Sequence, residues 1–348
     1  SDDLRGDKLE GDSIAQQDYE ETRYSFELGG ALIEDQLFFY GAYEKYDGAD
    51  LNNRGAIGSG AVNEVPVTQA ELDRIAQIAR DVYGYEPGRT VSEAFDFDDE
   101  KYLFKLDWYA SDTQRLSMTY MYNDSFNYTA SDGDLDEFEF DKHFYKRGAE
   151  LTTYNINWYA DWSENFSTEV RYSYSEVDFL QASVSGGDFA EFRIELDEVD
   201  VYLGQDDSRQ ANDLDWEVQQ LVARGTYIMD DHAITFGYER DASDIYNLFY
   251  QHVDTEIRFD GIDNFEQGIA ARVYYGNAIS NNELDAAVSW GYTIHTAYIE
   301  DEWQVSPDFR LTYGLRYDSY ESDDKPALNP AFTACLLYTS PSPRDPTS

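Results

Sequence analysis

The residues best suited to chemistry are carboxylates in one short acidic run. Its candidate ligands are Asp132, Asp134 and Asp136, which alternate along the chain, and Glu139, three residues further on. Carboxylate oxygens spaced in this way are the ligands that calcium prefers. An EF-hand would have its turning glycine where Glu137 stands, and a bidentate glutamate at the twelfth position, which is His143. Two interpretations therefore remain open: a calcium site in this loop, or a solvated acidic loop without a bound ion.

No pattern of catalytic residues accompanies the acidic run. The four histidines, which are His143, His232, His252 and His295, are far apart and match no zinc-binding spacing. The glycine-rich run at 55–60 lacks the lysine of a phosphate loop and is interpreted as flexible loop. Neither a nucleophile elbow nor a dinucleotide fingerprint occurs. No catalytic or cofactor-binding residue is predicted, and the protein is not expected to be an enzyme.

The charge of the chain limits its partners. Its 348 residues include 71 acidic and 25 basic side chains, which gives a formal net charge of −46. A surface of this sign repels the phosphate backbone, which argues against nucleic acid as a partner, and none is expected. Hydrophobic residues make up 42% of the chain, enough for a folded protein. The acidity indicates a large solvated surface, with calcium or a cationic ligand as the alternative.

Strands with alternating apolar and polar residues must position the acidic loops. The clearest pair lies within Thr293–Tyr320, where Leu311, Tyr313 and Leu315 share one face of the second strand. Eight further strands are predicted, at 22–32, 36–46, 101–109, 115–128, 151–162, 166–179, 214–228 and 233–246. Short turns alternate with long loops along this series. Long strands joined alternately by short turns and long loops favour an all-β fold. The specific prediction is an antiparallel transmembrane β-barrel, with about ten of its strands present in this chain.

The long loops are expected to carry structure of their own. Thr68 and Glu71 form a capping box at the start of a helix that Gly84 ends, so a short helix is predicted in an extracellular loop. The alternating run Phe189–Leu196 predicts a hairpin that projects beyond the main sheet. Aromatic residues in the loops are Phe189, Phe192, Tyr274, Tyr275 and Trp290. These rings either stack on a ring-containing ligand or pack the loops against one another.

The end of the chain departs from this pattern. From about Cys335 the sequence loses its acidity and its alternation, and three prolines fall within the last eight residues. The segment closely resembles the translated sequencing adapter that ends many metagenomic reading frames. Residues 335–348 are therefore interpreted as a non-native tail, and residues 1–334 as the barrel portion.

Two segments resemble the TonB-dependent outer-membrane receptors. The first, Leu28–Lys45, is similar to the Oar-like group, although Ala31 replaces a proline and Gln36 a lysine of its pattern. Its matching residues are Gly29, Gly30, Asp35, Leu37, Phe38, Phe39, Tyr43 and Glu44. The second, Tyr298–Asp318, departs from the family's pattern at Glu300, where a glutamine is usual. Its matching residues are Tyr298, Asp301, Trp303, Gly314, Leu315, Arg316, Tyr317 and Asp318.

The resemblance implies a protein of the outer membrane of a Gram-negative bacterium. A barrel of about twenty-two strands with a plug would surround these residues, and its strands would contact membrane lipid. The family takes up scarce or bulky ligands with energy delivered through the TonB complex. No plug or TonB box is recognised in this chain, so it is expected to be a fragment of the barrel wall. The matching residues are expected to be structural, and the transported ligand remains open.

Two other functions remain as alternatives. A passive outer-membrane porin would share the barrel but have no plug and no energy coupling. A soluble or surface-exposed all-β module for binding or adhesion would use similar strands without crossing a membrane. Loops of about forty residues suit ligand capture better than open diffusion, which favours the receptor.

Overall fold

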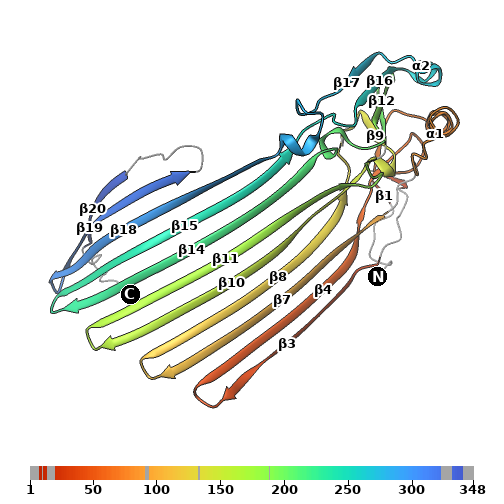
Figure 1. Ribbon diagram of the computed structural model, residues 1–348. Helices are drawn as coiled ribbons and strands as arrows, with labels where there is room; N and C mark the ends of the chain where they lie inside the picture. The colour runs from red at the N-terminus through yellow and green to blue at the C-terminus, as the bar shows by residue number, and fades with distance from the viewer. Residues whose placement is uncertain are drawn as a thin grey trace, which may run out of the picture.

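The computed structural model describes residues 8–9, 11–13, 20–90, 94–131, 134–187, 189–322 and 331–339. Its main feature is a sheet of eleven strands in the order β20-β19-β18-β15-β14-β11-β10-β8-β7-β4-β3 (Figure 1). The strands are β3 (Thr22–Ile33), β4 (Leu37–Leu51), β7 (Ala94–Ser111), β8 (Gln114–Thr129), β10 (Tyr145–Ser163), β11 (Phe166–Ser183), β14 (Asn212–Met229), β15 (His232–Phe249), β18 (Val288–Ser306), β19 (Phe309–Ser322) and β20 (Ala331–Thr339). Each strand pairs antiparallel with its neighbour in the chain, and the ten predicted strands are all confirmed.

The strands are longer than the alternation of apolar residues predicts. β7 begins at Ala94 rather than Lys101, because its acidic residues Asp98–Glu100 continue the ladder with β4 and β8. β10 and β18 have 19 residues each. At about 3.3 Å per residue such a strand is roughly 60 Å long, whereas a tilted strand needs only about 9–11 residues to cross a bilayer. The loop ends of the strands therefore extend well beyond a membrane.

β20 lies where the sequence predicts a loop and then the non-native tail. Its backbone pairs with β19 from Asp318↔Ala331 to Arg310↔Thr339. This pairing covers the backbone groups along that side of β19, which an unpaired edge would leave without partners. The prediction of a loop before Cys335 is therefore wrong at 331–334. Residues 340–348 lie outside the described residues, and the non-native origin of the tail stays a prediction.

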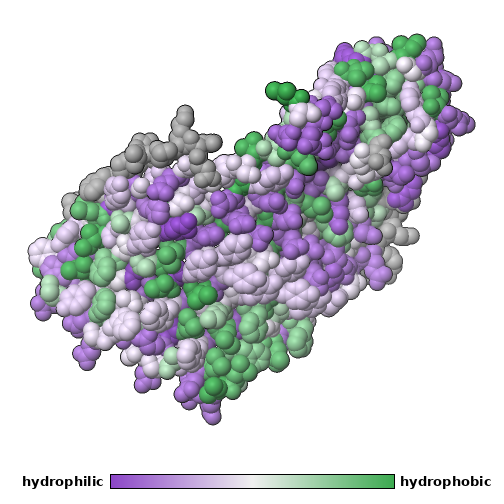
Figure 2. All heavy atoms as spheres, in the orientation of Figure 1, coloured by the Kyte–Doolittle hydropathy of each residue, from purple (hydrophilic) through white to green (hydrophobic). Residues whose placement is uncertain are grey.

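The two faces of the wall differ in chemistry. Side chains of one face align across strands, as in the row Leu106↔Met118, Met118↔Ile156 and Ile156↔Tyr172. Many of these large apolar side chains are exposed, among them Phe26, Phe104, Tyr154, Ile156, Phe236, Ile299 and Leu315. Figure 2 shows hydrophobic side chains gathered over the turn ends of β3, β4 and β7. A broad exposed apolar face of this kind fits contact with lipid.

The opposite face of the wall carries ion pairs, both within a strand and between neighbouring strands. Glu169 contacts Arg171, with Oε1 and Nε 3.1 Å apart, and also Arg224 of β14. Farther along the sheet, Arg316 Nε donates to Asp318 Oδ1 at 3.0 Å. The side chains therefore divide as the alternation predicts, apolar on one face and charged on the other. No helix within the described ranges is long and apolar enough to cross a membrane.

The long connections gather at the end of the wall opposite the hairpin turns and fold together there (Figure 1). We call this unit the loop domain. Its sheet has the order β17-β16-β12-β13-β9. The elements are β9 (Glu137–Glu139), β12 (Glu191–Glu195), β13 (Asp200–Leu203), β16 (Glu256–Asp260), β17 (Arg272–Tyr274), α1 (Gln69–Tyr83) and α2 (Ile262–Gln267). Shorter elements are β1 (Lys8–Leu9), β2 (Asp12–Ser13), β5 (Arg54–Gly55), β6 (Asn63–Glu64) and the 3₁₀ turns η2 (Asp141–His143), η3 (Asp207–Arg209) and η4 (Glu283–Ala286).

The loop domain has its own hydrophobic core. Its buried members come from four connections and include Val65, Val67, Leu72, Ile75, Phe138, Phe140, Phe192, Ile194, Val201, Leu203, Phe259 and Phe265. The predicted helix and the β12–β13 hairpin are confirmed. Ile78 belongs to the buried stripe of α1, whereas Val82 in the last turn is 51% exposed. The loops therefore form one folded unit and do not fold separately from one another.

Candidate functional site in the loop domain

The sheet topology of the loop domain brings six titratable residues to one end. β12 and β16 are parallel, so Glu191 and Glu256 stand opposite each other at the start of the two strands. β13 runs antiparallel to β12 and parallel to β9, so the segments after β13 and β9 leave at that same end. These segments supply Asp206 and Asp207 in one case and His143 in the other. The turn before β16 supplies the sixth residue, His252.

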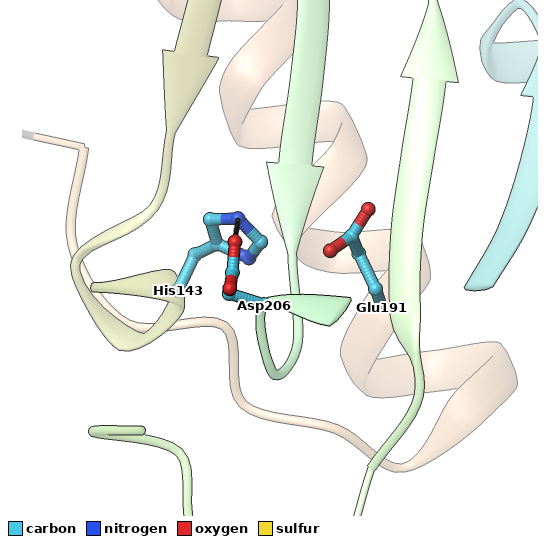
Figure 3. Close-up of side chains that lie close together, drawn as sticks. All are labelled: His143, Glu191 and Asp206. Carbon is cyan, nitrogen blue, oxygen red and sulfur yellow. Dashed lines mark ion pairs between the residues drawn. The ribbon is translucent and has the colours of Figure 1, made fainter. Parts of the chain in front are cut away.

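His143, Glu191 and Asp206 form the more buried of two clusters (Figure 3). Their exposed fractions are 0%, 3% and 2%. The Nδ1 atom of His143 lies 3.2 Å from the carbonyl oxygen of Gly204, and must donate because a carbonyl only accepts. Its Nε2 lies 3.9 Å from Asp206 Oδ2. The imidazole is thus oriented by a backbone carbonyl, as in many histidines that bind metals.

The buried cluster is electrostatically costly for its glutamate. Burial raises the pKa of the Glu191 carboxyl well above its usual value, and the carboxylates of Asp207, Asp206 and Glu256 raise it further. His143 acts in the opposite direction. The backbone N–H of Asp207 donates to Glu191 Oε2 at 2.7 Å and joins this cluster to the second one. A cation at this end of the sheet would favour the ionised carboxylate.

Asp207, His252 and Glu256 form the second cluster. His252 Nδ1 lies 3.2 Å from Asp207 Oδ2 and 3.7 Å from Glu256 Oε2. Arg258 Nε donates to the other carboxylate oxygen of Glu256. The Tyr274 ring stacks on the imidazole, with the ring centroids 5.5 Å apart. Chemically, these side chains offer one nitrogen and two oxygen atoms to a shared point.

Three of the four predicted calcium ligands, Asp134, Asp136 and Glu139, lie elsewhere in the loop domain. Glu139 belongs to β9, and its carboxylate accepts a hydrogen bond from the Ser131 N–H at 3.3 Å. The N–H of Asp134 donates to Glu137, and the carbonyl oxygen of Asp136 accepts from Asp200. Within the described residues, none of these three falls in a metal-type cluster of side chains. Asp132 lies outside the described residues, and the calcium site stays a prediction.

The sequence gives little sign of the two observed clusters. Their members come from three connections, and no local spacing joins them. The clearest available signals are the adjacent pair Asp206-Asp207 and the four-residue separation of His252 from Glu256. Such signals are too common in an acidic chain to identify a site.

Several residues of the two family motifs make side-chain contacts in the wall. The ring of Tyr298 lies over Gly237, where an added Cβ would be 2.5 Å from its Cζ. Trp303 stacks on His232, and Asp301 accepts from the Tyr313 hydroxyl. In the first motif, Asp35 has a φ of 60° in the β3–β4 turn. Further contacts join Phe38 to Tyr109, Tyr43 to Tyr102, Glu44 to Arg23 and Arg316 to Asp318.

The wall has one apolar face suited to lipid and one charged face, with short turns at one end and folded loops at the other. This combination defines an outer-membrane barrel protein. Comparison with known families agrees, because residues 7–329 match the outer membrane beta barrel domain. The chain belongs to this family, and its place is the outer membrane of a Gram-negative bacterium. Membership excludes the alternative of a soluble all-β module.

Solved structures show the same fold at low sequence identity. The outer membrane transporter YddB from Escherichia coli is 12% identical with a TM-score of 0.59, over 94% of this chain and 37% of that chain. The siderophore receptor PirA from Acinetobacter baumannii is 14% identical with a TM-score of 0.52, over 94% and 39%. A mutant of the ferric enterobactin receptor PfeA from Pseudomonas aeruginosa is 14% identical with a TM-score of 0.51, over 91% and 38%. The chain thus spans under two fifths of these structures, and no curated protein sequence matches it.

Proposed function

We propose that this chain is part of a TonB-dependent receptor that takes up a scarce or bulky ligand across the outer membrane. The observation that carries the proposal is the loop domain, in which loops from four connections share one buried core. A folded unit of this kind presents a fixed surface to a ligand and lowers the entropy lost on binding. Passive diffusion through a porin would not require such a surface.

The fold neighbours add support of a general kind. Their names describe a transporter and two receptors for iron-binding compounds, and none describes an enzyme. An iron chelate, a vitamin, an oligosaccharide and a peptide all remain possible ligands for this chain. The proposal includes no catalytic step and no nucleic acid partner. TonB would act on parts of the receptor outside the wall strands described above.

The test is uptake in the natural host by the complete receptor. Strains with and without the receptor gene are grown on limiting amounts of each ligand class in turn. For the class whose use depends on the receptor, deletion of TonB should abolish growth to the same extent as deletion of the receptor. Growth that persists without TonB would contradict energy coupling and favour the passive porin.

A further inference from the structure

The second cluster of the loop domain lies where two connections meet. Asp207 follows β13, whereas His252 and Glu256 follow β15. We propose that Asp207, His252 and Glu256 bind one divalent transition-metal ion, with zinc as the best fit, and that this ion joins the two connections. This proposal does not depend on uptake or on the identity of the transported ligand, because it rests only on the positions and contacts of these three side chains.

The distances between the candidate ligand atoms fit a small ion. His252 Nδ1 lies 3.2 Å from Asp207 Oδ2 and 3.7 Å from Glu256 Oε2. Zinc binds nitrogen and carboxylate oxygen at about 2.0–2.2 Å, so two ligands of a tetrahedral ion lie roughly 3.4 Å apart. The two measured distances lie on either side of that value. An ion placed between the three atoms would need only small movements of the side chains.

Two of these atoms have no hydrogen bond among the described residues. They are Glu256 Oε2 and His252 Nδ1, and the Glu256 side chain is only 2% exposed. A buried carboxylate oxygen without a hydrogen-bond partner has lost its hydration without compensation, which destabilises the fold. A metal ion would satisfy the nitrogen and the oxygen together.

Neighbouring groups hold the carboxylates so that one oxygen of each remains for an ion. The hydroxyl of Ser208 donates to Asp207 Oδ1 at 2.8 Å, which leaves Oδ2 toward His252. Arg258 Nε donates to Glu256 Oε1, which leaves Oε2 on the same side. Hydrogen bonds of this kind orient metal ligands and are a regular part of metal sites.

The ligand set selects the kind of ion. Calcium and magnesium prefer oxygen ligands alone and coordinate six or more atoms. One imidazole with two carboxylates suits zinc and similar first-row ions, which bind nitrogen well. Three protein ligands leave a fourth position for water or for a donor group of a passing ligand.

The test measures metal binding to the complete receptor, purified in detergent and freed of metal with a chelator. Cobalt(II) serves as the spectroscopic probe, because its visible absorption reports tetrahedral coordination, and zinc is then added as the competitor. We expect one cobalt per receptor, displaced by zinc but not by calcium. His252→Ala and Glu256→Gln should each weaken cobalt binding by more than about 100-fold, beyond the loss usual for an outer-shell change.

Two matched variants serve as controls. His295→Asn removes a histidine from the wall, and Asp213→Asn changes a cluster made of carboxylates alone, Asp178 with Asp213 and Asp215. Both should bind cobalt as the parent does. Resistance of the loop domain to protease, measured without metal, identifies any variant that fails to fold. Glu256→Gln is the variant expected to keep this resistance, because glutamine has the same shape as glutamate.

Three results would overturn the proposal. The first is a receptor that binds no stoichiometric cobalt or zinc. The second is cobalt binding that survives both His252→Ala and Glu256→Gln. The third is a signal lost in His143→Ala but kept in His252→Ala, which would place the ion in the neighbouring buried cluster instead.

Discussion

Tyr298 shows how a single motif residue supports the wall. Its side chain lies on the charged face, over Gly237 of the neighbouring strand, and the two residues are directly opposite in register. The motif alone marks Tyr298 as structural. The motif does not show what Tyr298 contacts, because Gly237 belongs to a distant part of the sequence and is not part of any recognised motif.

Replacement of this glycine tests the contact. Gly237→Ala places a Cβ about where the Tyr298 ring now lies, and displacement of that ring should cost about 1–3 kcal/mol. Gly30→Ala is the matched control, because nothing lies within 4 Å of its added Cβ. Unfolding of the complete receptor in urea, followed by its heat-modifiable mobility on gels, measures the difference. Equal losses in the two variants would contradict the packing.

The cap of α1 is the residue-scale feature that the sequence predicts best. Thr68 accepts from the Glu71 N–H, and the Glu71 carboxylate accepts from the Thr68 N–H at 2.8 Å. A capping box is a local pattern, so its four residues are enough to place it. The two histidine clusters differ in this respect, because their members meet only through the folded sheet.

The cap also predicts a pH dependence. Hydrogen bonds from the Thr68 side chain and backbone hold the pKa of Glu71 below its usual value. The contribution of the ionised carboxylate is therefore complete above the unfolded-state pKa of about 4.3, and is lost as the pH falls through the lower folded-state pKa. Glu71→Gln should speed hydrogen exchange in α1 at neutral pH. The difference between parent and variant should disappear in acid, and a difference that is constant with pH would contradict the role of the charge.

At the scale of elements, the alternation of apolar residues identifies every wall strand except β20, but not the ends of these strands. The apolar rows cover only the part of each strand that meets lipid. Beyond that part, the hydrogen-bonded ladder continues through polar residues such as Asp98–Glu100, whose sequence does not alternate between apolar and polar. Strand identity is therefore predictable, whereas strand length depends on backbone pairing.

An arginine scan of β10 tests which face meets lipid. Ile156 is 40% exposed on the apolar face, and its neighbour Asn155 points to the other side. Ile156→Arg should cost about 2–4 kcal/mol if the residue lies near the membrane midplane. Asn155→Arg should be tolerated, because Ser173 and Thr119 stand opposite it and no cation does. Assembled receptor in outer membranes is the measurement, and equal tolerance would refute the lipid-facing assignment.

A core substitution tests whether the loops form one unit. Phe265 of α2 is fully buried and stacks on Tyr83 of α1, with ring centroids 4.9 Å apart. Phe265→Ala should destabilise the loop domain by about 3–5 kcal/mol and open it to protease. The wall should keep its heat-modifiable mobility, and Phe249→Ala, at a residue 50% exposed, should change neither property. Protease resistance that survives Phe265→Ala would contradict a shared core.

For the whole molecule, connection length predicts the topology but not the fold of the loops. Short turns such as 164–165 and long loops alternate along the chain, so the two rims can be assigned from sequence. The loop-domain sheet contains parallel pairs, β12 with β16 and β13 with β9, whose partners lie about sixty residues apart. Parallel pairing between distant segments leaves no local pattern, which is why only one hairpin and one helix of this unit are predictable.

The separation of short turns from folded loops predicts the orientation of the whole molecule in the membrane. The loop domain should face the outside of the cell and the hairpin turns the periplasm. With Cys335 replaced by serine, Asp73→Cys on the exposed side of α1 should react with an impermeant thiol reagent in intact cells. Glu164→Cys, in the β10–β11 turn, should react only after the outer membrane is opened. Both positions are exposed on the protein surface, so any difference in labelling must come from the membrane. Labelling of Glu164→Cys in intact cells would contradict the proposed orientation.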